Sequence, residues 1–143
     1  MNETRKYLNQ ANRVLNEIEK RREMAERLYS IAIRIAPILS DTPKGDFEPG
    51  KMGDCIAEKA DLEKEIDELR KIWKTKAIEL MRLFYCVAKG RVLEVLMLHY
   101  IHNMTIGEIS DKISVADHHV REYRNRGERL CIKQLELEKE LFG

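Results

Sequence analysis

Apolar side chains recur three and four positions apart in the first part of the chain, with polar residues between them. The series comprises Leu8, Ala11, Leu15, Ile18, Ala25, Leu28, Ile31 and Ile35. This period predicts an amphipathic helix from about Glu3 to Ala36. Because Pro37 has no backbone N–H to donate, we expect the helix to end or kink near Ala36.

A stretch rich in proline and glycine separates this helix from a second one. Ser40–Asp54 (SDTPKGDFEPGKMGD) predicts a loop. Beyond it the three-four spacing resumes over roughly five heptads, with Lys59 and Lys76 at two seam positions. The apolar members are Cys55, Leu62, Ile66, Leu69, Trp73, Leu80, Leu83 and Val87. The two stripes predict a long antiparallel helical hairpin of the coiled-coil type, whose remaining apolar surface would pair with a second copy.

Shorter elements are expected after this period stops at the sequence VAKGR, where Gly90 is the break. A short apolar helix follows in VLEVLMLHYIHN. Another begins in MTIGEISDKI, where Thr105 and Glu108 have the spacing of a capping box. A last helix is expected over residues 116–141. One face of it carries Val120, Tyr123, Gly127, Leu130, Gln134, Leu137 and Leu141, a stripe that Gly127 and Gln134 weaken locally.

Met104–Leu130 fits two helices joined by a tight turn, as in a helix-turn-helix, where one helix supports a second that enters the DNA major groove. The supporting side chains are Ile106, Ile109 and Ile113 on the first helix, small Ser110 at the close approach, Val115 in the turn, and Val120 with Tyr123 facing inward on the second. The sequence therefore predicts an all-α protein. It comprises a hairpin over residues 1–87 that mediates self-association and a helix-turn-helix domain over residues 88–143.

The opposite face of the second helix carries side chains suited to DNA. Arginine can bridge two acceptors on guanine, and asparagine can pair with adenine. The candidate DNA-binding residues are Asp117, His118, Arg121, Glu122, Arg124, Asn125, Arg126 and Arg129. We expect His118, Arg121 and Asn125 at base edges, and the other three arginines near phosphates. The carboxylates of Asp117 and Glu122 would oppose phosphate binding, and exposed basic helix faces are often simply solvated.

Charged residues make up 36% of the chain and glycine and proline are few, which favours long solvated helices. Two acid-before-base pairs, Glu17 with Arg21 and Glu23 with Arg27, have the spacing that supports an exposed helix face. The net charge of +1 gives no overall attraction to nucleic acid. Any attraction is local, since basic residues outnumber acidic ones between residues 118 and 133. At physiological salt, a phosphate is attracted mainly by charges within the Debye length of about 8 Å.

Other classes of function find little support. The three cysteines are widely spaced, which indicates neither a disulfide framework nor a four-ligand zinc site. His99 and His102 lack a third ligand, and His118 and His119 point in different directions on a helix, so no metal or other cofactor is expected. We find no catalytic arrangement and no phosphate loop, and we expect no enzyme. No apolar run is long enough for a membrane, and a cytoplasmic location in a bacterial host is expected.

The segment VLMLHYIHNMTIGEISDKISVADHHVREYRNRGERL resembles the helix-turn-helix of sigma-factor region 4. The order of the whole chain resembles small phage-encoded transcriptional regulators related to late-gene activators of low-GC Gram-positive bacteria. In this chain, Pro43 with Gly45 corresponds to the loop of those regulators, and Asp54–Leu69 (DCIAEKADLEKEIDEL) corresponds to the helix that follows it. The segment quoted above corresponds to their region-4-like end. The run HYIHNMTIGEIS is the more specific part. The resemblance implies regulation of transcription at phage promoters.

Three positions depart from that pattern. His99 stands where such proteins usually carry arginine, Ser114 replaces a turn glycine, and Ala116 replaces a serine or threonine cap. A lost cap costs about 0.5–2 kcal/mol. A non-glycine residue in a left-handed turn adds strain.

The sequence thus predicts a sequence-specific regulator that binds double-stranded DNA as a homodimer or higher homo-oligomer. Two alternatives remain open. In one, the charged face docks on RNA polymerase or another protein. In the other, the chain is a structural coiled-coil oligomer that binds no DNA.

Overall fold

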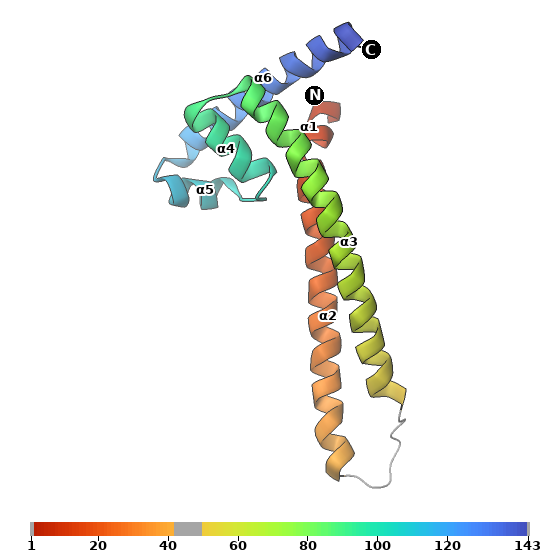
Figure 1. The fold of residues 1–143 in the computed structure, drawn as a ribbon. Coiled ribbons are helices and arrows are strands. Elements are labelled where there is room, and N and C mark those ends of the chain that lie inside the picture. Colours follow the sequence, from red (N-terminus) through yellow and green to blue (C-terminus); the bar gives the residue numbers. More distant parts are fainter. Residues whose placement is uncertain (1, 42–49, 143) are drawn as a thin grey trace. The chain divides into compact units, whose positions relative to one another are not determined.

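A computed structural model describes residues 2–41 and 50–142. Within these ranges the chain is all-α, as predicted, and forms no strand. The helices are α1 (Asn2–Leu8), α2 (Gln10–Asp41), α3 (Gly50–Val87), α4 (Gly90–Tyr100), α5 (Ile106–Ile113) and α6 (Asp117–Phe142), shown in Figure 1. They build two compact units. A middle unit comprises Val14–Ile72, and a terminal unit comprises Met1–Arg13 together with Trp73–Gly143.

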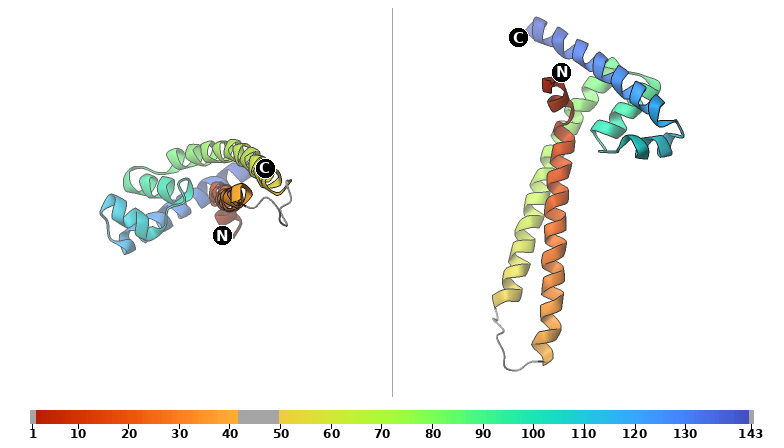
Figure 2. Two further views of the ribbon diagram at one scale, coloured as in Figure 1. Left: turned by 90° about the horizontal axis from the view of Figure 1, so that it is seen from below. Right: turned by 180° about the vertical axis from the view of Figure 1, so that it is seen from behind.

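In the middle unit, α2 and α3 lie side by side and run antiparallel (Figures 1 and 2). Arg21 Nε donates to Glu65 Oε2 at 2.9 Å, and the Lys59 ammonium lies 5.6 Å from the centre of the Tyr29 ring. Among the residues of this unit whose side chains the structure describes, Ile18, Ala25, Ala32 and Ile66 are the buried apolar ones. Every predicted seam residue of α3 is at least half-buried, which confirms that stripe.

The stripe on α2 differs from the prediction at one position. Ile31 is 45% exposed, whereas Ala32 is buried. The buried positions Ala11, Ile18, Ala25 and Ala32 stand seven residues apart, the repeat that keeps a seam facing its partner helix. Ile31 falls one residue off that repeat. The side chain of Ile35 lies outside the described residues.

Two predicted helix boundaries were wrong. The first helix is interrupted at Asn9, whose side chain donates to the Arg5 carbonyl at 2.9 Å, and α2 then continues through Pro37 to Asp41. Proline removes a single helical donor, and the residues that follow it keep their own. The predicted loop over residues 40–54 is also too long, because α2 includes its first two residues and α3 begins at Gly50. Residues 42–49, with Pro43 and Gly45, lie outside the described ranges.

The terminal unit has a core to which the start and the end of the chain both contribute. Leu8, Leu80, Phe84, Leu96 and Cys131 are fully buried in one cluster, so α1, α3, α4 and α6 share it. A second cluster comprises Val95, Ile109, Ile113 and Val120, from α4, α5 and α6. The half-buried Tyr123 packs against both clusters.

Helices α4 and α6 pack closely where Leu96 meets Gly127. A Cβ atom placed on Gly127 would lie only 2.6 Å from Leu96 Cδ2 and 2.7 Å from its Cγ. Both residues are buried. The glycine that weakened the predicted stripe therefore lets the two helix backbones approach each other.

Candidate nucleic-acid interface

Helix α5 begins with the predicted capping box. Thr105 Oγ1 accepts from the Glu108 N–H, and Glu108 Oε1 accepts from the Thr105 N–H, each at 3.2 Å. These two bonds satisfy backbone donors that the first turn of a helix leaves open. The start of α5 is thereby fixed, and buried Ile109 and Ile113 face the core.

The turn between α5 and α6 is closed by two hydrogen bonds between the same residues. The Val115 N–H donates to the Ser110 carbonyl at 3.2 Å, and the Ser110 hydroxyl donates back to the Val115 carbonyl. Ser114 is left-handed, with φ 55° and ψ 47°, so a non-glycine residue does occupy this strained position. Ser110 therefore holds the turn closed through its hydrogen bonds with Val115, in addition to being the small residue predicted at the close approach of the helices.

Val120 and Tyr123 hold α6 against the core on the side that the sequence predicts. Val120 is fully buried and Tyr123 half-buried. The Ala116 carbonyl accepts from the N–H groups of His119 and Val120 in the first turn. Asp117 supplies a carboxylate there, which is favourable at the positive end of a helix.

The side chains on the opposite face of α6 lie in solvent. The exposed candidate residues are Asp117, His118, Arg121, Glu122, Asn125, Arg126 and Arg129. Arg126 and Arg129, with Lys133, also border a shallow hollow whose apolar wall is Leu130 and Ile132. Within the terminal unit, this face therefore offers exposed guanidinium and amide donors, although Glu122 lies 3.7 Å from His119 Nδ1. The His118 and His119 rings lie 4.0 Å apart, centre to centre, despite their adjacent positions on the helix.

Arg124 differs from its neighbours because it turns toward the core. Its Nε lies 3.8 Å from Glu128 Oε1, and its side chain is only 26% exposed. Glu128 also accepts a short hydrogen bond from the Tyr100 hydroxyl, and Arg5 Nη2 lies 3.8 Å from its second oxygen. Burial, and then Glu128, raise the pKa of Tyr100 well above its usual range. Sequence reasoning missed this cluster, although Glu128 stands eight residues after Val120, on the inward face of α6.

His99 lies next to Tyr100 of this cluster and is held by hydrogen bonds to the backbone and from Asn12. Its Nδ1 lies 2.9 Å from the Met104 carbonyl, and its own carbonyl accepts from Asn12 Nδ2 at 2.8 Å. Burial lowers the pKa of His99, and the Met104 carbonyl opposes that shift only in part. His102, the other histidine weighed as a ligand, is exposed. In the described part of the chain, no three histidine, cysteine or carboxylate side chains lie close enough to hold a metal ion.

Cys131 is fully buried in the core of the terminal unit, and burial raises the pKa of its thiol to about 12. Cys55 is half-buried and Cys86 is exposed; each carries a free thiol. Over residues 2–41 and 50–142, no helix is long and apolar enough to span a membrane. Comparison with protein families, curated proteins and solved structures finds no match to this chain.

Proposed function

We propose that this protein is a sequence-specific DNA-binding regulator of phage or prophage transcription. In this proposal α5 and α6 form a helix-turn-helix, and α6 enters the major groove. The helices α2 and α3 form a coiled-coil hairpin through which the chain self-associates. The regulator would act in the cytoplasm of a bacterial host, on promoters whose polymerase it contacts or occludes.

One observation carries the proposal: α6 is anchored by buried Val120 while the face with His118, Arg121 and Asn125 remains exposed. A reading helix needs this division, because one side must hold the helix rigidly and the other must reach base edges. The ordered start of α5 and the closed turn add support, since they fix the angle at which α6 leaves α5.

The arginines differ in the part they would take. Arg121 is exposed and has no ion-pair partner among the described residues, so it is free to reach a base. Arg126 and Arg129 beside the basic hollow suit phosphates. Arg124 is held by Glu128, and we propose that it positions α6 and contacts DNA only through the backbone phosphates nearest to it.

Replacing Arg121 by alanine tests the proposal. We expect the affinity for DNA from upstream of the protein's own operon to fall by about 5- to 150-fold, which corresponds to roughly 1–3 kcal/mol for one bidentate base contact. Fluorescence anisotropy at two salt concentrations measures it, and circular dichroism confirms that the helices persist. The matched control is Arg82→Ala, an exposed arginine on α3, which should bind as the parent protein does.

Two results would contradict the proposal. Equal affinity of the Arg121→Ala variant and the parent protein removes Arg121 from the interface. Phosphate contacts are strongest at low salt, so a DNA-binding face should bind DNA there. Absence of DNA binding at every salt concentration instead favours a protein partner such as RNA polymerase for the same face.

A further inference from the structure

The face of the middle unit that carries the Arg21–Glu65 hydrogen bond leaves apolar side chains in solvent. Met24 and Leu28 follow Arg21 by three and seven positions, and Ile31 continues their spacing. Met24 is 51% exposed and Ile31 45%, with half-buried Leu28 between them. These three residues form an apolar row on the outer side of α2. Its four-three spacing is that of a coiled-coil seam.

Helix α3 contributes apolar residues to the same face. Leu62, Leu69 and Ile72 lie three positions before, four after and seven after Glu65, so they share its side of the helix. Leu62 and Leu69 are half-buried, and Ile72 is 46% exposed. Exposed and half-buried apolar side chains on one face of a charged helix pair indicate an interaction surface.

Charges of opposite sign border this surface on its two helices. On α2 the border has a net positive charge, with Lys20, Arg27 and Arg34 at seven-residue intervals and one carboxylate, Glu23, beside them. On α3 the border is acidic, with Asp54, Glu58, Asp61 and Glu65 at intervals of four, three and four. All eight are exposed. Arg27, Arg34, Asp54, Glu58 and Asp61 form no ion pair with another described residue, and the predicted Glu23–Arg27 pair is not formed.

The two borders are in register along the helices. Arg21 is level with Glu65, and Tyr29 is level with Lys59. In an antiparallel pair, each step up α2 is a step down α3, so Lys20 is level with about Glu65, Arg27 with about Asp61, and Arg34 with about Asp54. Each basic residue therefore has an acidic residue at its own height on the other helix.

We propose that a second copy of this chain covers this face, with α2 of each copy packed against α3 of the other around a twofold axis parallel to the helices. Such an axis keeps every residue at its own height, so the basic border of one copy meets the acidic border of the other twice. An axis perpendicular to the helices would place α2 against α2 and bring like charges together. Like-charge juxtaposition disfavours that arrangement.

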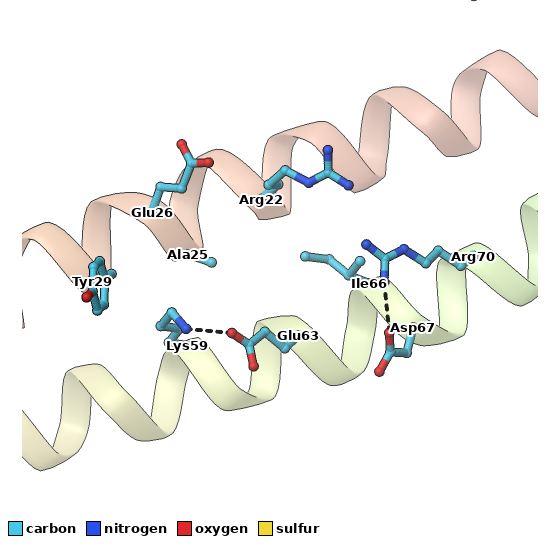
Figure 3. A pocket seen from close by; sticks show the side chains of 9 residues that line it. All are labelled: Arg22, Ala25, Glu26, Tyr29, Lys59, Glu63, Ile66, Asp67 and Arg70. Carbon is cyan, nitrogen blue, oxygen red and sulfur yellow. Dashed lines mark hydrogen bonds and ion pairs between the residues drawn. The ribbon is translucent and has the colours of Figure 1, made fainter. Parts of the chain in front are cut away.

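On the opposite face of the middle unit, most charged side chains are paired within the chain. There Lys59 Nζ lies 2.6 Å from Glu63 Oε1, Arg70 Nη1 lies 3.2 Å from Asp67 Oδ1, and Tyr29 accepts the Lys59 ammonium on its ring (Figure 3). Ala25 and Ile66 form the floor of this groove. Both of its arginines and its one lysine are paired within the chain, and among its charged lining residues Glu26 alone has no ion pair with another described residue, so this face supplies the control surface.

The inference rests on the proposed function, of which it specifies the self-association surface. A parallel axis makes both copies leave the interface at the same end, through Ile72. Their downstream residues 73–143 therefore start side by side, as the reading of two neighbouring half-sites requires.

Charge reversal and its rescue test the interface. The first variant is Arg27→Glu with Arg34→Glu, and the second is Asp54→Lys with Glu58→Lys and Asp61→Lys. Sedimentation equilibrium without DNA should show a dimer for the parent chain and a dissociation constant at least tenfold higher for each variant alone. An equimolar mixture of the two variants should regain the dimer, with one chain of each kind by native mass spectrometry.

The matched control reverses two arginines of the opposite face, Arg22→Glu with Arg70→Glu, and should dimerise like the parent chain. Circular dichroism verifies that every variant keeps its helices. A parent chain that stays monomeric, a control that dissociates as much as the first variant, or a mixture that does not pair would overturn the inference.

Binding to a DNA duplex with a single half-site separates this inference from the proposed function. If the chain is monomeric but binds that duplex through Arg121, only the interface is wrong. If it dimerises as described and binds no DNA, the interface stands and the proposed function fails.

Discussion

Glu128 is a carboxylate on which three helices converge. It is 9% exposed, accepts from the Tyr100 hydroxyl of α4, and has the guanidinium groups of Arg124 and Arg5 at 3.8 Å. A buried carboxylate without such partners would be expensive to desolvate. The cluster thus ties α1, α4 and α6 together, and it keeps Arg124 against the core while Arg121 remains exposed.

His99 makes the stability of the terminal unit depend on pH. Burial lowers its pKa in the folded chain below the usual value of about 6.5, whereas the unfolded chain titrates at that value. Between the folded-state and unfolded-state pKa values of His99, the unfolded state binds more protons. The free energy of unfolding is therefore at its full value above about pH 6.5 and decreases as the pH drops below it. We expect a lower thermal midpoint at about pH 5 than at about pH 7.5, followed by circular dichroism.

Two histidine variants separate this effect from general acid destabilisation. His99→Gln should flatten the dependence between these pH values, whereas His102→Gln, at an exposed position of the same segment, should leave it unchanged. The same slope in the parent chain and in His99→Gln would contradict the assignment.

Single residues on one helix face were predictable, whereas contacts between distant residues were not. Spacing alone predicts that Val120 faces inward and Arg121 outward, because positions along a helix fix direction. The same reasoning places Arg124 among the phosphate contacts. Glu128, its partner, is also bound by Tyr100 and Arg5, which lie far away in the sequence. Local spacing cannot predict contacts between residues so far apart.

At the scale of elements, the contact between α4 and α6 depends on the missing side chain of Gly127. A new Cβ atom would lie 2.6 Å from Leu96 Cδ2, and Leu96 must shift within a fully buried site to admit it. Gly127→Ala should therefore lower the free energy of unfolding by about 1–3 kcal/mol through overpacking, which outweighs the gain in helix propensity. Urea denaturation measures it.

Gly107 provides the matched control for this substitution. A Cβ atom there meets nothing within 4 Å, so Gly107→Ala in α5 should be neutral or stabilising by about 0.5–1 kcal/mol. If Gly127→Ala stabilises the protein as Gly107→Ala does, the close approach of α4 and α6 does not constrain that position.

The elements also show where periodicity suffices. The capping box of Thr105 and Glu108 and the α3 seam depend on local spacing, and both are confirmed. The interruption at Asn9 is accompanied by a side-chain bond to the Arg5 carbonyl, and the continuation through Pro37 depends on the balance of one lost hydrogen bond. Apolar spacing accounts for neither. The hairpin and the helix-turn-helix as functional motifs, with a division at residue 87, stay predictions.

At the scale of the whole molecule, residues of α1 and the start of α2 pack in the same core as residues of α6. Leu8 and Ala11 are fully buried in the core that α3, α4 and α6 complete. Leu8→Ala should lower the free energy of unfolding by about 2–5 kcal/mol, the usual loss for a buried leucine. Hydrogen exchange should show the loosening in α4 and α6 as well as in α1.

An exposed leucine in the same unit supplies the comparison. Leu141 is 68% exposed, and Leu141→Ala should change neither the stability nor the exchange of α4 by a measurable amount. Equal effects of the two substitutions would show that α1 is dispensable for the core.

This shared core also sets the order in which the chain can fold on the ribosome. Residues 2–13 are synthesised well before their packing partners Leu96 and Cys131, which emerge roughly a hundred residues later. Until then α3 alone can cover the apolar side of α1, and this partial cover lengthens the time over which chaperones can bind the nascent chain.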